Sequence, residues 1–216
     1  KMPGRIPGSF LGGVGEKGVS EELLLDIATQ LARLHAIPLE TFSEFIQRHD
    51  DVELLAQGEK GTVNACYRRA VEAWARYESE VAHLPSPYFH FLRDWLLRNI
   101  PEDSRRPVLV HGDFNIHNLL VEDEKVSGVL DWECAQFGAP EQDLAYIKPH
   151  LSQLINWDRF MARYYEAGGR AVEPATLSFY QAYSMMRLHI GMNHGLLNLQ
   201  QGINRDIRYS VIELAF

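Results

Sequence analysis

Three short β-type runs interrupt a chain that otherwise has the pattern of a helical protein. The runs at 108–110, 118–121 and 126–130 are apolar and partly β-branched, which is the composition that favours strands. A charged turn at 122–125 separates the second run from the third. The pattern predicts a β-hairpin with one extra strand, embedded among helices.

Helical periodicity dominates the rest of the sequence. Ser20 is expected to cap a helix with apolar residues at steps of three and four. The clearest pattern runs from Thr62 to about His83, and Ser86-Pro87 is a suitable start for the next helix. Further helices are predicted at 156–167, from about Pro174, after Asn204 and, with a weaker pattern, over 43–57. The fold class is therefore α+β and mostly α-helical.

Polar residues lie where the predicted strands begin and end: His111, Asp113, Asn118 and Asp131. Gly112 permits a tight turn after the first strand, so the carboxylate of Asp113 can project from the edge of the β element. Asn118 begins the return strand and Asp131 ends the third, so both side chains can converge on that edge. Carboxylate and amide oxygens suit Mg²⁺, which also takes water and substrate phosphate. The set predicts phosphoryl transfer, in which positioning and charge neutralisation supply most of the catalysis.

The histidines allow a second interpretation, a metal-dependent hydrolase. His111 and His117 lie close in sequence to Asp113. Such enzymes collect several His and carboxylate ligands from the ends of many strands, whereas this chain offers one hairpin, so the interpretation is remote. His117 is expected to be a surface loop residue. Cys66 and Cys134 lack the spacing of a disulfide framework or a zinc site and are expected to be free thiols.

The segment from His111 to Glu133 resembles the catalytic loop and metal-binding strand of aminoglycoside phosphotransferases and their choline-kinase-like relatives. It reads H-G-D-x-x-x-x-N followed by D-W-E, a spacing similar to that of the catalytic-loop and metal-binding residues of protein kinases. A Gly-Pro turn and the run Asp143-Leu144-Ala145 continue the family's pattern. LARLHAIP at 31–38 resembles the family's helix ending in Leu-His. The resemblance implies the C-terminal lobe of a protein-kinase-like fold, with the catalytic loop on a small β-hairpin element.

The same resemblance implies an ATP-dependent kinase of small molecules that uses Mg²⁺. Asp113 would be the catalytic base that aligns the acceptor hydroxyl. Asn118 and Asp131 would hold Mg²⁺ against the ATP phosphates. His111 and Asp143 would support the loop without taking part in the chemistry.

The acceptor side is less well defined by the resemblance. Glu133 is a candidate for binding the acceptor, and a structural carboxylate is an equally good interpretation. The stretch Phe179–Met192 has helical spacing and is expected to be core, with its remaining face lining the acceptor site. The implied acceptor is a small-molecule hydroxyl, as in an aminoglycoside, another amino alcohol or a sugar. Antibiotic resistance is one role that such an acceptor allows, and the sequence leaves it open. The alternative is a non-catalytic, pseudokinase-like binding module, against which the intact Asp113, Asn118 and Asp131 argue.

The ends of the chain carry a prediction about domains. Residues 1–19 are rich in Gly and Pro and are predicted to be a hinge, and 20–216 the helical catalytic and substrate-binding lobe. Met2-Pro3-Gly4 resembles the family's adenine-contacting hinge, so Met2 and Pro3 are candidate nucleotide contacts. No Gly-rich loop or phosphate-pairing Lys precedes it. The nucleotide-clamping N-terminal lobe is therefore expected to be missing, and the fragment alone to be inactive.

Composition limits the partners. The formal net charge of the 216 residues is −8, whereas a nucleic-acid-binding face needs clustered Lys and Arg. The longest apolar runs are too short to cross a bilayer. We therefore expect a cytoplasmic protein that binds neither nucleic acid nor membrane, and the sequence leaves the oligomeric state open.

Overall fold

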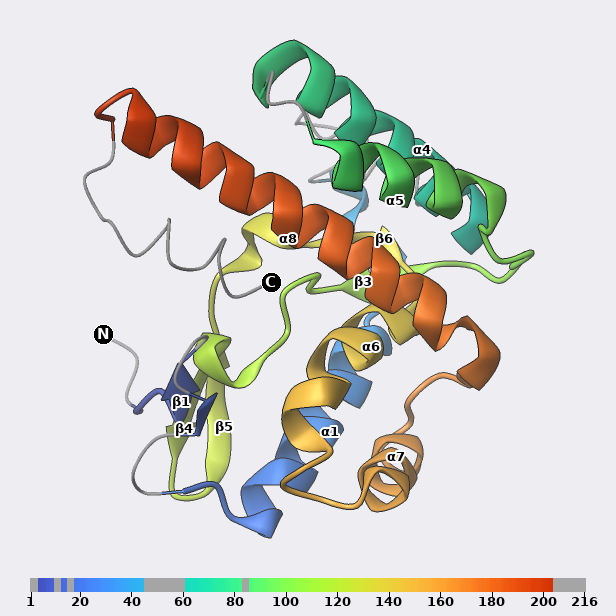
Figure 1. The fold of residues 1–216 in the computed structure, drawn as a ribbon. Coiled ribbons are helices and arrows are strands. Elements are labelled where there is room, and N and C mark those ends of the chain that lie inside the picture. The colour runs from blue at the N-terminus through green and yellow to red at the C-terminus, as the bar shows by residue number, and fades with distance from the viewer. Residues whose placement is uncertain (1–3, 10–12, 15–17, 45–60, 83–85, 204–216) are drawn as a thin grey trace.

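The computed structural model describes residues 4–9, 13–14, 18–44, 61–82 and 86–203, which form helices around small antiparallel sheets (Figure 1). The helices are α1 (Glu21–His35), α4 (Val63–Tyr77), α5 (Pro87–Arg98), α6 (Pro140–Leu151), α7 (Trp157–Glu166) and α8 (Leu177–Gln200). The strands are β1 (Gly8–Ser9), β2 (Gly13–Val14), β3 (Val108–Val110), β4 (Leu119–Glu122), β5 (Lys125–Val129) and β6 (Gln136–Gly138). The mostly helical architecture is confirmed.

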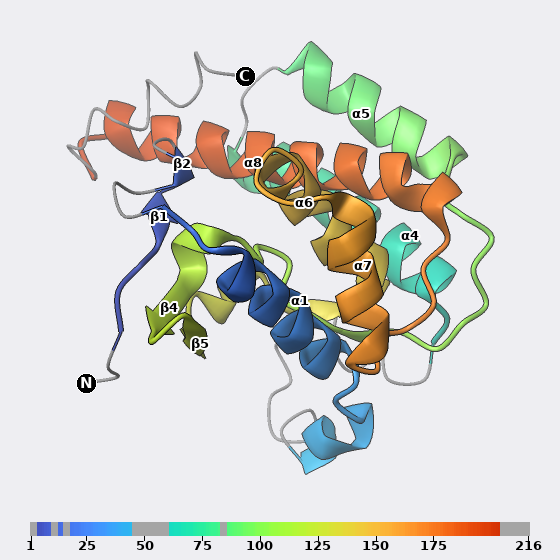
Figure 2. The same ribbon diagram turned by 90° about the horizontal axis from the view of Figure 1, so that it is seen from below.

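Helix α8 crosses the molecule between two groups of helices (Figure 1), and α5 lies on the side of α8 opposite to α1 (Figure 2). Helices α4 and α5 lie on one side of it, and α1, α6 and α7 lie on the other. One buried cluster joins α1, α7 and the β4–β5 hairpin, and a second joins α4, α5 and α8. Helix α6 contributes Leu144 and Ile147 to the first cluster and Ala145 to the second. It therefore connects the two cores.

The predicted helix starts are confirmed by their caps. The hydroxyl of Ser20 accepts a hydrogen bond from the backbone N–H of Leu23 at 3.1 Å. Thr62 and Ser86 cap α4 and α5 in the same way, three residues before their donors. Each cap satisfies one N–H that has no partner inside its helix.

The strand predictions were partly wrong. The hairpin exists, with β4 and β5 displaced by about one residue from the predicted bounds, and Asp123 and Glu124 turn the chain with positive φ. The extra strand β3, however, pairs with β6 and lies outside the hairpin's own sheet. Strand β6 has only three residues, too few to show an alternating pattern in sequence.

One helix prediction needs correction. The helix predicted from Thr62 to His83 is α-helical only to Tyr77, and a π-helical turn, Glu78–Ala82, follows where the chain packs against α8. Such a turn changes the direction of the side chains after it. Within the predicted hinge at 1–19, β1 and β2 form a small ribbon, and Arg5 pairs with Val121 at the edge of the hairpin.

Some predictions fall outside the described residues. These are the candidate nucleotide contacts Met2 and Pro3, the helix after Asn204 and most of the weak helix at 43–57.

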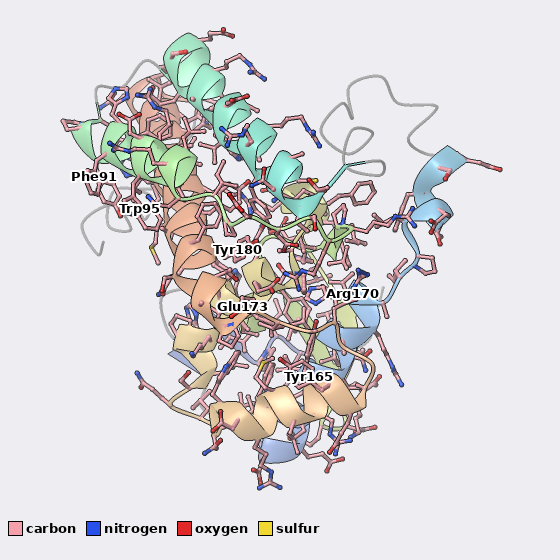
Figure 3. All side chains as sticks on the ribbon, turned by 90° about the vertical axis from the view of Figure 1, so that its right-hand side faces the viewer. Phe91, Trp95, Tyr165, Arg170, Glu173 and Tyr180 are labelled. Atoms are coloured by element: carbon pink, nitrogen blue, oxygen red, sulfur yellow. The ribbon has the colours of Figure 1, made fainter. Side chains whose placement is uncertain are left out.

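The outer face of α5 carries exposed apolar side chains, among them Phe91, which is 63% exposed (Figure 3).

In the part of the chain that the structure describes, no helix combines the length and apolar character needed to cross a membrane.

Candidate active site

The loop after β3 is folded around the ring of His111. Gly112 has φ of +79°, which is costly for residues with a Cβ. The turn brings the backbone N–H of Asp113 to Nδ1 of His111 at 3.2 Å, while Nε2 of the same ring lies 2.8 Å from the carbonyl oxygen of Leu130. Because a carbonyl only accepts, Nε2 carries the proton and Nδ1 is the acceptor. His111 thus links the loop to the end of the hairpin.

Asp143 holds the backbone of the same loop from the opposite side. Its two carboxylate oxygens accept hydrogen bonds from the N–H groups of His111 and Gly112, both at 2.8 Å. The carboxylate is fully buried and also lies 3.2 Å from Nε2 of His35. The other nitrogen of His35 is 2.9 Å from the hydroxyl of Tyr164. The loop is therefore fixed to α6, α1 and α7 through one carboxylate.

Asp113 projects from this loop and is only partly buried. Its Oδ2 accepts a hydrogen bond from Nδ2 of Asn118 at 2.8 Å, and Nε2 of His117 lies 3.6 Å away. Burial opposes ionisation of Asp113, but hydrogen bonds from His117, Tyr146 and Asn118 outweigh it, so the pKa of this carboxyl lies below its ordinary value of 3.8. Asp113 is therefore a carboxylate at neutral pH. Burial and this neighbouring charge raise the pKa of Tyr146, which stays a neutral hydrogen-bond donor.

The position of His117 corrects the prediction of a surface loop residue. Its side chain is only 16% exposed and faces Asp113. The cause is the short 3₁₀ turn Ile116–Asn118, which the apolar Ile116 anchors in the core. The turn carries the neighbouring imidazole back toward the catalytic loop.

The hairpin brings Asn118 and Asp131 to the same edge. The backbone N–H of Leu130, which precedes Asp131, donates to the carbonyl oxygen of Asn118 at 2.8 Å. Asp131 lies two residues beyond the end of β5, is exposed, and has φ of +64° and ψ of +59°. A left-handed conformation in a residue with a Cβ costs roughly 1–2 kcal/mol and often occurs at functional sites.

This donor set fits Mg²⁺ if phosphate completes the coordination. Nδ2 of Asn118 donates to Asp113. The side-chain oxygen Oδ1 of Asn118 is left to serve as a metal ligand beside the carboxylate of Asp131. Within the described ranges, no cluster of three or more His, Cys, Asp or Glu side chains could hold a metal by itself. Mg²⁺ is commonly bound by one or two protein oxygens together with substrate phosphates, and this edge offers that number.

A cleft of about 430 Å³ opens beside Asp113. Its walls come from the catalytic loop, the turn Trp132–Cys134, α4, α6 and α8. The lining residues are Trp74, Gly112, Asp113, Glu133, Cys134, Tyr146, Ser184, Arg187, Leu188, Gly191 and Met192. Asn118 and Asp131 do not line this cleft, so Asp113 stands between the candidate metal edge and the cleft.

The structure adds residues that the sequence prediction missed. Tyr146 follows Asp143-Leu144-Ala145 by one position and reaches Asp113. Arg187 is the one Lys or Arg of the predicted core stretch Phe179–Met192. A single charge in an otherwise core-like stretch is a sequence signal that could have marked it as a candidate site residue. The stretch itself has a buried face, as predicted, and a second face on the cleft. Glu133, the candidate acceptor contact, is exposed and lies at the cleft.

Solved structures with a similar fold include phosphotransferases. A putative aminoglycoside phosphotransferase from Ralstonia eutropha JMP134 superposes with a TM-score of 0.66 at 21% identity, over 87% of this chain and 59% of that chain. A macrolide 2′-phosphotransferase from Brachybacterium faecium gives 0.60 at 23% identity, over 94% of this chain and 63% of that one. At these identities the likeness establishes the fold alone.

Curated relatives are much longer proteins. Acyl-CoA dehydrogenase family member 11 of Rattus norvegicus is 36% identical over 111 residues, which are 50% of this chain and 14% of the rat protein. Probable acyl-CoA dehydrogenase IBR3 of Arabidopsis thaliana is 31% identical over 168 residues, 64% of this chain and 20% of that protein. The chain thus spans a small part of the length of these relatives.

The sequence profile of one protein family covers most of the chain. It is the phosphotransferase enzyme family, called APH, and the match extends over residues 1–183. This range includes the catalytic loop, the hairpin and the buried carboxylate that supports them. The chain belongs to the phosphotransferase enzyme family.

Proposed function

We propose that this chain carries the catalytic and acceptor-binding lobe of a kinase that transfers the γ-phosphoryl group of ATP to a hydroxyl of a small molecule. Membership of the phosphotransferase family supports the reaction class. The single observation that carries the proposal is the position of Asp113, which faces the cleft and is held by Asn118 of the candidate metal edge. A hydroxyl in the cleft would therefore lie next to the transferred phosphoryl group.

Asp113 would orient the acceptor and take its proton. Its lowered pKa keeps it ionised at neutral pH, so an acceptor hydroxyl can donate a hydrogen bond to it. In a loose phosphoryl-transfer transition state the proton leaves late, and alignment of the oxygen is the larger contribution. The bonds from Asn118 and Tyr146 fix the carboxylate in one direction.

The candidate metal edge would hold Mg²⁺ on the nucleotide phosphates. The ion neutralises charge that develops during phosphoryl transfer. Asn118 and Asp131 would supply two oxygen ligands, and His111 would keep both close by tying the loop to Leu130. Asp131 is exposed at the end of the hairpin and has left-handed backbone angles.

The test is ADP formation by the full-length protein that contains this chain, with ATP, Mg²⁺ and a panel of hydroxyl-bearing small molecules. We expect Asp113→Asn to lower acceptor-dependent turnover by about 10²–10⁴-fold, because the positioned base is lost. Asp123→Asn is the matched control, since Asp123 is exposed in the hairpin turn and its positive φ suits Asn. The control should keep full activity.

Two results would count against the proposal. Full turnover in Asp113→Asn would show that Asp113 is not the catalytic base. Absence of Mg²⁺-dependent ADP formation with every acceptor, in a protein that still binds nucleotide, would favour the pseudokinase-like binding module.

A further inference from the structure

Arg187 places a cation inside the cleft next to the catalytic loop. It lies on α8, surrounded in sequence by apolar residues, and is partly buried. Its Nη1 donates to the carbonyl oxygen of Gly112 at 3.0 Å, and Nη2 lies 3.5 Å from the carbonyl oxygen of Cys134. The guanidinium therefore contacts the two backbone carbonyls that are next in sequence to Asp113 and to Glu133.

No carboxylate of the described residues is in direct contact with this guanidinium. Among the described residues, no Asp or Glu forms an ion pair with Arg187, and its contacts to Gly112 and Cys134 are neutral carbonyls. Nε is buried and has no hydrogen-bond partner. An Arg has five N–H donors in a planar fork that fits oxyanions. The nearby carboxylates of Asp113 and Asp143 act on this charge, but neither forms an ion pair with the guanidinium. An oxyanion in the cleft can therefore bind the donors that remain unused.

The location favours the acceptor over the nucleotide as the source of that charge. Arg187 shares the cleft with Leu188 and Met192 on the α8 wall, while the candidate metal ligands Asn118 and Asp131 lie outside it. The ring of Tyr183, 5.9 Å from the guanidinium, supports the side chain from one face. The carboxylates of Asp113 and Glu133 occupy other walls, so an anionic group fits only against Arg187.

We propose that Arg187 is the anion-binding residue of the acceptor site, and that the acceptor carries a carboxylate or phosphate group near the hydroxyl that is phosphorylated. This deepens the proposed function and rests on it for the identity of the cleft as the acceptor site. A purely cationic acceptor, such as an aminoglycoside, would face the guanidinium with a like charge.

The test is a fluorescence titration of the chain, using Trp74 at the cleft as the reporter, with inorganic phosphate and glycerate as probes at constant ionic strength. Glycerol, which has hydroxyls and no charge, is the matched probe. Saturable binding of both anions and none of glycerol is expected. Arg187→Gln should weaken anion binding by about tenfold or more, because the charge-assisted hydrogen bonds are lost. Arg187→Lys should weaken it less, since it keeps the charge and loses the fork.

Arg163→Gln is the control, since Arg163 is an exposed arginine on α7 remote from the cleft. It should bind the anions like the wild type. Unchanged binding in both Arg187 variants, with folding verified by circular dichroism, would overturn the proposal, as would absence of anion binding by the wild type. Displacement of phosphate by Mg²⁺-ATP but not by Mg²⁺-ADP would place the anion at the γ-phosphoryl position and overturn the acceptor assignment. These measurements record binding and do not need turnover. A failure of the kinase proposal would instead appear in the assay of ADP formation, so the two failures can be distinguished.

Discussion

At the scale of single residues, Asp143 shows how a buried charge can be tolerated. Both of its oxygens are used by backbone N–H groups of the catalytic loop, and His35 lies beside it. A buried carboxylate that accepts several hydrogen bonds is compensated for the water it has lost. Its function is to determine where Asp113 lies, although it does not reach the cleft.

We predict that Asp143→Asn lowers the free energy of unfolding by about 1–3 kcal/mol. One acceptor oxygen becomes an NH₂ donor that faces a backbone N–H, so a buried donor loses its partner. Urea denaturation followed by circular dichroism measures the change. The exposed Asp123→Asn should stay within about 0.5 kcal/mol of the wild type. Equal stability of the two variants would show that the hydrogen bonds to the loop are dispensable.

At the scale of elements, the site depends on two turns that touch. The loop 111–113 follows β3, and the turn Trp132–Cys134 follows β5. They meet at Gly112, where an added Cβ would collide with the backbone carbonyl of Cys134. Glycine is therefore required at position 112 for two reasons: the positive φ and the close approach of the Cys134 carbonyl.

Gly112→Ala should destabilise the protein by roughly 2 kcal/mol or more, because a left-handed Ala is strained and the turn of Cys134 must move. Gly191→Ala is the opposite case. Gly191 lies inside α8, and a Cβ added to it would meet no other side chain or segment, so Ala should stabilise that helix by up to about 1 kcal/mol. Thermal unfolding should show a lower Tm for Gly112→Ala and a higher Tm for Gly191→Ala than for the wild type. A tolerated Gly112→Ala would mean that the two turns are not in firm contact.

At the scale of the whole molecule, two cores are joined through α6. Leu31 is fully buried in the cluster of α1 and α7, and Leu96 is fully buried in the cluster of α4, α5 and α8. Helix α6 places side chains in both. Loss of either core should therefore remove the support of the shared helix, and with it the catalytic loop that Asp143 holds.

We predict that Leu31→Ala and Leu96→Ala each cost about 2–5 kcal/mol and that unfolding remains one cooperative transition in both variants. Tryptophan fluorescence and far-ultraviolet circular dichroism should give coincident curves. Leu154→Ala, at a position that is 40% exposed, is the control and should change little. Separate transitions in either core variant would mean that the two halves unfold independently.

Local sequence was sufficient for much of the structure. The caps at Ser20, Thr62 and Ser86 were predictable because a capping hydroxyl and its donor N–H are three residues apart. The hairpin was predictable because its two strands are adjacent in sequence and separated by a charged turn. The residue set of the catalytic loop follows from one continuous segment, His111 to Glu133.

Tertiary packing decided the rest. The pairing of β3 with β6 joins residues about thirty positions apart through only three pairs, which no local pattern encodes. The approach of Tyr146 to Asp113 depends on where α6 packs. Arg187 reaches the catalytic loop across 75 residues of sequence. The sequence by itself determined the candidate residues for phosphoryl transfer, whereas only the fold placed a cation beside them, because contacts between distant segments depend on how the cores pack.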